Sequence, residues 1–241
     1  MATTPEGFFA ELLATQPSRP FVTYYDEATG ERTELSVKSL ANWIAKTHFL
    51  LVDELGLGAG DTALISLPAH WISVAPLLGA LTAGLRLTAD GPAEVAFVGD
   101  QRPDVEAATA RAPEVFAVAP ASAALGFRGA EPQGTVDFVV AVRAQADAWG
   151  SVRFGATATD PCLDGATRAE VAARAADRAG ELGLRRGARV LTTRPWTSAT
   201  DWLDTLLAPL AVGGSVVYIA NCTDPAVLDR RAEQERVTDR I

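Results

Sequence analysis

The chain has 241 residues, of which 48% are hydrophobic and 21% are charged, and this composition excludes an intrinsically disordered protein. Its formal net charge of −9 at pH 7 argues against nucleic acids and anionic membrane surfaces as partners. Two isolated cysteines and two histidines provide no metal-binding pattern. The N-terminus has no basic leader segment, and no apolar stretch reaches the roughly 18 residues of a membrane span, so we expect a soluble, cytoplasmic protein.

Predicted strands and helices alternate along the chain. In the first half they are a helix at 8–15, hairpin strands at 21–26 and 32–36, a long helix capped by Ser36, a strand at 61–67, a helix at 70–84, a strand at 94–99, a helix at 103–112 and a strand at 114–119. After a loop at 120–132 they are a helix at 136–149, a strand at 152–154, a helix at 167–184, a strand at 188–193, a helix at 201–213, a strand at 215–220, a helix at 224–235 and a strand from 236. This alternation predicts an α/β fold with a mostly parallel sheet covered by helices on both faces.

An internal repeat supports this fold class. Residues 55–68 align without gaps on residues 182–195, and each copy joins an amphipathic helix to a strand, a second helix, a glycine and another strand. The leucine-glycine pair at the start of each copy fits a left-handed helix C-cap. We therefore predict a single region over 1–241 built from two pseudo-repeats, at about 20–150 and 151–241. The alternative is that helix ends before strands resemble one another by chance.

Two segments at the carboxyl ends of the repeated strands carry candidate ligand-binding residues. Ligands gather at this edge of open parallel sheets. An imidazole, two indoles, a guanidinium and a hydroxyl would suit an aromatic-lined pocket with one charged anchor. The candidates for this crevice are His70, Trp71, Arg194, Trp196 and Thr197.

Each of these residues also has a structural interpretation. Trp71 fits the core of an apolar helix, His70 a helix start, and Trp196 a cover over the sheet end. Arg194 could pair with Asp201 or Asp204. His48 is expected to be structural. No GxSxG, HExxH or Walker lysine motif is present, so no catalytic residue and no metal ligand is assigned.

Residues 153–168, RFGATATDPCLDGATR, occupy the context of a phosphate-binding loop, between a predicted strand and a predicted helix. The stretch has no lysine, and only Gly155 precedes its aspartates. Asp160 and Asp164 would face a bound polyanion, and at about 4 Å each like-charge contact costs on the order of 1 to 4 kcal/mol.

The order of segments resembles a known superfamily. The run at 31–84, with Gly60-Asp61 and Ala83-Gly84, and the run at 183–218 are similar to the N-terminal subdomains of adenylate-forming enzymes, the acyl-CoA synthetase-like or AMP-binding superfamily. The resemblance spans most of residues 20–240. It is closest to short, uncharacterised actinobacterial proteins of that group, and the excess of arginine over lysine is typical of a GC-rich genome.

The phosphate loop of that family reads approximately [YF]TSGTTGxPK, and the resemblance places it from Phe154 onward. Only Thr159 keeps the residue type of the core loop. Thr157 and Asp160 stand where glycines are expected, and Leu163 stands where the lysine is expected. The resemblance therefore implies a degenerate phosphate-loop position at Thr157, Thr159, Asp160 and Leu163.

The resemblance also implies that other parts of the family's machinery are absent. The chain ends about where the adenine-binding motif, the magnesium glutamate, the ribose-binding aspartate and the C-terminal domain with the catalytic lysine would come. Thr197 and Ser198 stand where the family has a histidine. We therefore expect a truncated pseudoenzyme that binds a small molecule or a protein, with neither ATP, AMP nor CoA as a cofactor.

Two alternatives stay open. The chain could be an incomplete adenylate-forming ligase that a partner chain completes, or a stand-alone enzyme that uses the crevice for a reaction the sequence does not identify. A homodimer is a further hypothesis, because truncation of a larger fold would expose apolar surface that association would bury.

Overall fold

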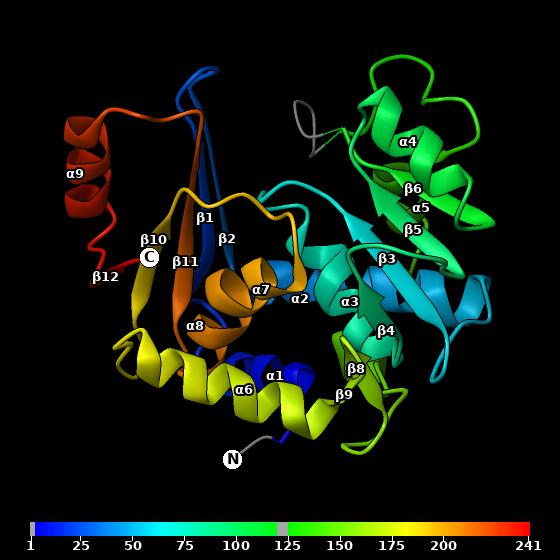
Figure 1. The fold of residues 1–241 in the computed structure, drawn as a ribbon, viewed down its shortest axis with the longest axis horizontal. Coiled ribbons are helices and arrows are strands. Elements are labelled where there is room, and N and C mark those ends of the chain that lie inside the picture. The colour runs from blue at the N-terminus through cyan, green and yellow to red at the C-terminus, as the bar shows by residue number, and fades with distance from the viewer. Residues whose placement is uncertain (1–2, 120–124) are drawn as a thin grey trace. The chain divides into compact units, whose positions relative to one another are not determined.

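The computed structural model describes residues 3–119 and 125–241, so part of the predicted loop at 120–132 lies outside the described residues. The chain divides into two compact units. Unit 1 combines residues 1–40 with 169–241, and unit 2 comprises residues 41–168. Each unit contains one sheet (Figure 1).

The sheet of unit 1 has the strand order β12-β10-β11-β1-β2. β2 runs antiparallel to β1, and the other neighbouring strands are parallel. The elements of this unit are α1 (Pro5–Thr15), β1 (Pro20–Asp26), β2 (Glu31–Ser36), α6 (Arg168–Glu181, whose first residue belongs to unit 2), β10 (Arg189–Thr192), α7 (Ala199–Trp202), the π-helix η4 (Leu203–Leu207), α8 (Ala208–Ala211), β11 (Ser215–Ala220), α9 (Pro225–Gln234) and β12 (Asp239–Arg240).

The sheet of unit 2 has the order β7-β6-β5-β3-β4-β8-β9, in which only the pair of β8 and β9 is antiparallel among the described residues. Its elements are α2 (Val37–Phe49, which begins in unit 1), the π-helix η1 (Leu50–Glu54), β3 (Thr62–Ser66), α3 (Val74–Ala83), β4 (Arg86–Thr88), β5 (Val95–Val98), α4 (Arg102–Thr109), β6 (Glu114–Ala117), β7 (Val136–Asp137), α5 (Phe138–Arg143), the 3-10 helix η3 (Trp149–Ser151), β8 (Pro161–Leu163) and β9 (Ala166–Thr167). The two sheets confirm the predicted α/β class with mostly parallel strands.

The structure corrects three of the predicted elements. Residues 152–154 form no strand, because the chain there bonds to the end of a helix: the N–H of Gly155 donates to the carbonyl of Thr82 in α3. The predicted helix at 136–149 is a short strand followed by the short helix α5. The predicted loop before α6 contains the hairpin of β8 and β9. Its turn residues Asp164 and Gly165 have φ values of 50° and 75°, as in a type I′ turn.

The glycines of the internal repeat have the predicted conformation. Gly56 and Gly183 end their helices with φ values of 69° and 71°, in the left-handed region. Each then leads into a strand that is parallel to the next strand of its own sheet, β3 to β4 and β10 to β11. The division into pseudo-repeats at about 20–150 and 151–241 stays a prediction. The two compact units follow other bounds, because residues 1–40 belong to the same unit as residues 169–241.

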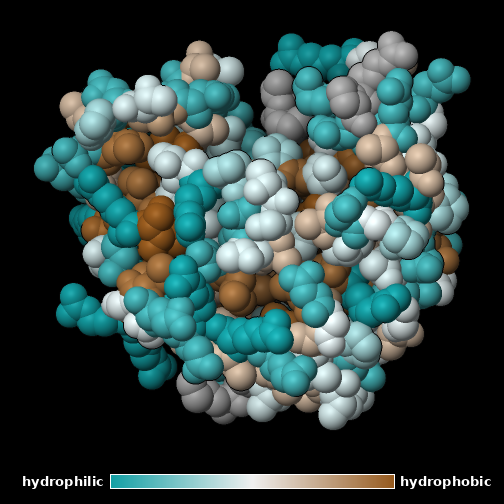
Figure 2. Space-filling view, viewed as in Figure 1, coloured by the Kyte–Doolittle hydropathy of each residue, from teal (hydrophilic) through white to brown (hydrophobic). Residues whose placement is uncertain are grey.

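The surface is mixed in character. Figure 2 shows hydrophilic side chains over most of the visible face, with apolar ones in smaller patches. Among the described residues, the large apolar side chains that are exposed are Leu125, Val136, Val140 and Phe154. Within residues 3–119 and 125–241, no helix has both the length and the apolar character needed to cross a membrane.

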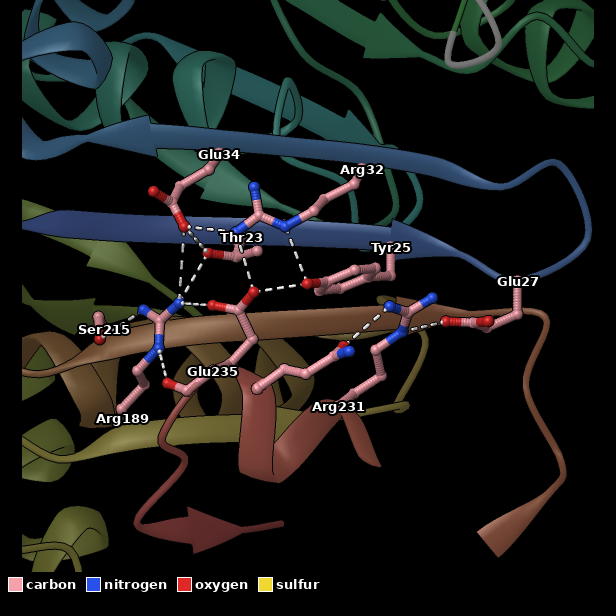
Figure 3. A network of polar contacts seen from close by, with 10 residues as sticks. Thr23, Tyr25, Glu27, Arg32, Glu34, Arg189, Ser215, Arg231 and Glu235 are labelled. Atoms are coloured by element: carbon pink, nitrogen blue, oxygen red, sulfur yellow. Dashed lines mark hydrogen bonds and ion pairs between the residues drawn. The ribbon is translucent and has the colours of Figure 1, made fainter. Parts of the chain in front are cut away.

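A polar network holds α9 on the sheet of unit 1 (Figure 3). The carboxylate of Glu235 is 7% exposed and accepts hydrogen bonds from the Tyr25 hydroxyl at 2.5 Å, from Arg32 at 2.9 Å and from Arg189. Arg231 lies over the Tyr25 ring, 4.1 Å from its centroid. Burial acts to raise the pKa of Glu235, but the hydrogen bonds from Tyr25, Arg189 and Arg32 outweigh it and hold the pKa below its ordinary value.

Helices α2 and α3 of unit 2 approach closely at a glycine. A Cβ atom built on Gly79 would lie 2.5 Å from the Cβ of Thr47, well inside van der Waals contact. Thr47 is fully buried, and its hydroxyl donates to the carbonyl of Trp43 at 2.9 Å, so it has little room to move. The side-chain volume at position 79 therefore sets the distance between the two helices.

Gly79→Ala should lower the free energy of unfolding by about 1–3 kcal/mol, because the added methyl group overpacks this contact. Gly180→Ala is the matched control, since Gly180 lies within α6 and a Cβ there meets nothing within 4 Å. The control should raise stability by about 0.5–1 kcal/mol through helix propensity. Urea unfolding monitored by circular dichroism measures both, and equal effects would show that the α2–α3 contact is not tight.

Glu235→Gln should lower the free energy of unfolding by about 3 kcal/mol at neutral pH, because it removes the largely buried carboxylate that Arg32 and Arg189 share and leaves only Glu34 beside them. Since the folded pKa of Glu235 is depressed, its contribution is present above the unfolded value of about 4.3 and is lost as pH falls through the folded pKa. The variant should therefore be less sensitive to acid than the parent. Glu233→Gln, an exposed position on the same helix, is the control, and identical pH profiles for the two variants would contradict the assignment.

Candidate functional site

The loop at the predicted phosphate-binding position is closed by its own aspartate. The carboxylate of Asp160 accepts a hydrogen bond from the N–H of Thr157 at 2.6 Å and from the Thr157 hydroxyl at 2.9 Å. The hydroxyls of Thr157 and Thr159 lie 3.1 Å apart. The bonds from the backbone and side chain of Thr157 lower the pKa of Asp160. The N–H and hydroxyl donors of Thr157 therefore already hold an anion, which belongs to the protein itself.

Packing requires the glycine at the start of this loop. The N–H of Gly155 donates to the carbonyl of Thr82 at 3.1 Å, at the end of α3. A Cβ atom on Gly155 would clash with the carbonyl of Ala83, and one on Gly84 would lie 2.8 Å from the carbonyl carbon of Gly155. Gly155 therefore has a structural reason to be glycine that is independent of any phosphate.

Arg168, at the first position of α6, anchors the other end of the loop. Its guanidinium is fully buried and donates to the carbonyls of Leu81 and Leu85, each at 2.9 Å, at the carboxyl end of α3. The backbone N–H of Arg168 donates to the carbonyl of Asp160 at 3.0 Å. The sequence interpretation missed this residue. The available signal was a basic residue in the first turn of a predicted helix, where the helix dipole favours acidic ones.

Leu163, which the resemblance places where a lysine is expected, lies within a strand. It lies in β8, is 7% exposed and pairs with Leu87 of β4. Together with Cys162 and Arg86 it lines a cavity of about 450 Å³ in unit 2. The side chain at this position is therefore buried, although the cavity beside it is also lined by the polar residues Arg86, Asp90 and Asp164.

The crevice candidates of unit 2 are part of its interior. His70 is 1% exposed and Trp71 is 3% exposed. The Nδ1 atom of His70 accepts a hydrogen bond from the N–H of Ile72 at 3.2 Å, and the Trp71 ring packs edge-on against Trp43, with 5.8 Å between centroids. His48, also buried, has its pKa lowered by burial.

Arg194 makes the ion pair that its structural interpretation foresaw. Its guanidinium lies 2.7 Å from the carboxylate of Asp204, which is 1% exposed. Arg178 binds the same carboxylate through two nitrogens, at 2.7 and 3.0 Å. The hydrogen bonds from Arg178, and then those from Arg194, lower the pKa of Asp204. The Arg194 guanidinium, the proposed charged anchor of the crevice, thus already has an acidic partner.

Trp196 and Thr197 lie at the start of α7. The indole N–H of Trp196 donates to the hydroxyl of Thr205 at 2.8 Å, and its ring packs at 90° on Tyr218. The N–H and hydroxyl of Thr197 donate to the carboxylate of Asp201, at 2.9 and 2.8 Å. Burial acts to raise the pKa of Asp201, but the bonds from Thr197 and Ser198 outweigh it and lower the pKa. These contacts fix the first turn of the helix.

The five crevice candidates divide between the units. His70 and Trp71 are neighbours in unit 2, whereas Arg194, Trp196 and Thr197 belong to the segment before α7 in unit 1. A single crevice formed by all five stays a prediction. Over residues 3–119 and 125–241, no group of three or more histidine, cysteine, aspartate or glutamate side chains could hold a metal ion.

The chain resembles solved structures of acyl-CoA-forming enzymes. It superposes on a Brucella canis acyl-CoA synthetase with a TM-score of 0.77 at 20% identity, and on an acetoacetyl-CoA synthetase from Streptomyces lividans with a TM-score of 0.79 at 17% identity. An anthranilate CoA ligase in complex with anthranoyl-AMP matches with a TM-score of 0.70 at 14% identity. The matches cover 98%, 98% and 90% of this chain but only 46%, 41% and 46% of those proteins. They confirm an acyl-CoA synthetase-like fold that spans less than half of those enzymes.

The comparison of sequences gives a relative that matches the chain over nearly the whole length of both. No family model matches the chain. A protein of Mycobacterium tuberculosis (strain ATCC 25618 / H37Rv) named "TIGR03089 family protein" is 39% identical over 241 residues, which cover 98% of this chain and 97% of the relative. At this identity and coverage, the chain belongs to the TIGR03089 family.

Proposed function

We propose that this protein is a catalytically degenerate relative of the adenylate-forming enzymes, which binds a small molecule or a partner protein without turning over ATP. The observation that carries the proposal is the position of the Asp160 carboxylate, which accepts hydrogen bonds from both the N–H and the hydroxyl of Thr157. The fold is similar to that of acyl-CoA synthetases. The negative charge of Asp160 in this loop, in contrast, disfavours the binding of a polyanion.

Phosphate-binding loops work by directing free backbone N–H groups at the anion. Here the Thr157 donor is used internally, so a triphosphate would have to displace Asp160 or lie beside it. A contact between two like charges is unfavourable, and its cost is smallest where water screens the charges. The lysine that would offset this cost is replaced by the buried Leu163.

Protonation cannot relieve the repulsion at neutral pH. The hydrogen bonds from Thr157 hold the pKa of Asp160 below its ordinary value, which is already about 3.9. The carboxylate therefore stays ionised over the physiological range. An ionised Asp160 keeps its bonds to Thr157 and keeps the loop closed.

The binding role rests on the retained scaffold. One of the structural neighbours is an anthranilate CoA ligase that holds anthranoyl-AMP. A protein with the same fold and a closed phosphate loop would keep surfaces that bind a small molecule or a protein. The alternative is that a partner chain completes an active ligase, and the measurements below distinguish it from binding without ATP turnover.

Purified protein should show no ATP–pyrophosphate exchange with carboxylic acids and no rise in melting temperature with millimolar Mg²⁺–ATP, because a ligand stabilises by RT ln(1 + [L]/Kd) only if it binds. Asp160→Asn should weaken the closure of the loop and remove its charge, so that ATP raises the melting temperature. Asp164→Asn is the matched control, because it makes the same charge change in the exposed hairpin turn, away from the donors of Thr157.

Exchange by the unmodified protein that Thr159→Ala abolishes would overturn the proposal. Exchange that appears only when a protein co-purified from the native cell is added would favour the ligase completed by a partner. An equal response to ATP in the Asp160 and Asp164 variants would show that closure by Asp160 is not what excludes the nucleotide.

A further inference from the structure

Unit 1 contains a cavity of about 500 Å³ that the assigned segments do not use. It lies between α1 and α8, which pack against each other (Figure 1), and the turns that precede β10 and β11. Its volume is within the range of about 300–1,000 Å³ that is typical of small-molecule sites. Because its turns precede parallel strands, it lies at their amino ends, opposite the edge where the predicted crevice is expected.

The floor of this cavity is apolar. Phe8 and Leu12, on one face of α1, are 7% and 3% exposed, and Leu210 of α8 is 1% exposed. An apolar group placed on this floor would remove these side chains further from water, at about 25 cal/mol for each Å² of apolar surface buried. The floor therefore favours a ligand with an apolar body.

One guanidinium lines the cavity and a second lies close to its wall, and neither has an acidic partner among the described residues. The exposed side chain of Arg186 lines it and makes no hydrogen bond or ion pair with the residues that the structure describes. Arg19 lies behind the wall, where it donates to the carbonyls of Gly213 at 2.8 Å and Gly187 at 2.6 Å, and no described carboxylate contacts it. Burial lowers the pKa of Arg19, and the nearby charge of Arg189 lowers it further, as expected for an uncompensated cation.

One carboxylate, that of Glu11, lines the same cavity, together with the amide of Gln16. The lining residues carry one cation and one anion, and Arg19, bonded to the carbonyls of the lining residues Gly187 and Gly213, adds a second cation nearby, in a chain whose net charge is −9. The Arg194 and Arg189 guanidiniums, by contrast, are held by buried acids. The electrostatic surplus at this cavity therefore favours a ligand with one negative charge.

We infer that this cavity binds an amphipathic monocarboxylate, with an aromatic or branched apolar body on the floor and its carboxylate on Arg186. A guanidinium presents two parallel N–H donors to a carboxylate, which gives both charge and geometry to the contact. The site is separate from the predicted crevice and does not depend on whether the phosphate loop has lost ATP turnover.

Phenylacetate is the probe, titrated into ¹⁵N-labelled full-length protein and followed by amide chemical shifts. Phenylacetamide and phenethylamine have the same ring with a neutral or a positive end. Arg186→Gln removes the anchor at an exposed position, and Arg185→Gln is the matched control, since Arg185 is also exposed but does not line the cavity. The melting temperature of each variant verifies that it folds.

We expect phenylacetate to shift amides of α1 and of residues 186–187 and 210–213. Arg186→Gln should weaken binding by about tenfold or more, the loss expected for a charge-assisted pair, whereas Arg185→Gln should leave it unchanged. Three results would overturn the inference: no shifts at the cavity, binding of phenylacetamide or phenethylamine as tight as that of phenylacetate, or equal loss in the two arginine variants.

Discussion

The carboxyl end of α3 is the constraint on which the phosphate-loop region depends. The last carbonyls of a helix have no partner within the helix and must find donors elsewhere. Here the N–H groups of Gly84 and Leu85 turn back onto the last turn, the N–H of Gly155 reaches the carbonyl of Thr82, and the buried guanidinium of Arg168 binds those of Leu81 and Leu85. Chain segments more than 70 residues apart are thereby joined at one helix end. This satisfies backbone groups that would otherwise be buried without hydrogen bonds.

This anchoring separates the position of the loop from its chemistry. Gly155 and Arg168 fix the two ends of the segment through contacts with α3, and neither contact involves a bound anion. Between these two ends, Asp160 closes the turn with its own carboxylate. The chain is similar in fold to synthetases at 17% to 20% identity, and the contacts that hold this segment in place involve no nucleotide.

The sequence predicts those features whose cause is local. Gly56 and Gly183 could be placed because a left-handed helix end strongly favours glycine. The hairpin at Asp164-Gly165 was equally predictable, since Asp-Gly is a strong type I′ signal, but its strands of three and two residues gave no periodic pattern. The strand expected at 152–154 was wrong because a short strand-like run does not specify its partner, and the backbone partner of the adjoining Gly155 is the end of a helix.

For the candidate site residues, too, contacts with partners close in sequence could be predicted and contacts with distant partners could not. Arg194 could be matched to Asp204 because the acid is close in sequence, whereas the partners of Arg168 lie 83 and 87 residues away and no pattern connects them. A donor group can bind a ligand readily only if no acceptor within the protein already occupies it. Thr157 donates to Asp160, and Arg194 donates to Asp204, so a ligand would have to break an existing hydrogen bond at either position. Arg186 has no such partner beside an apolar floor, so an incoming carboxylate would displace only water from it.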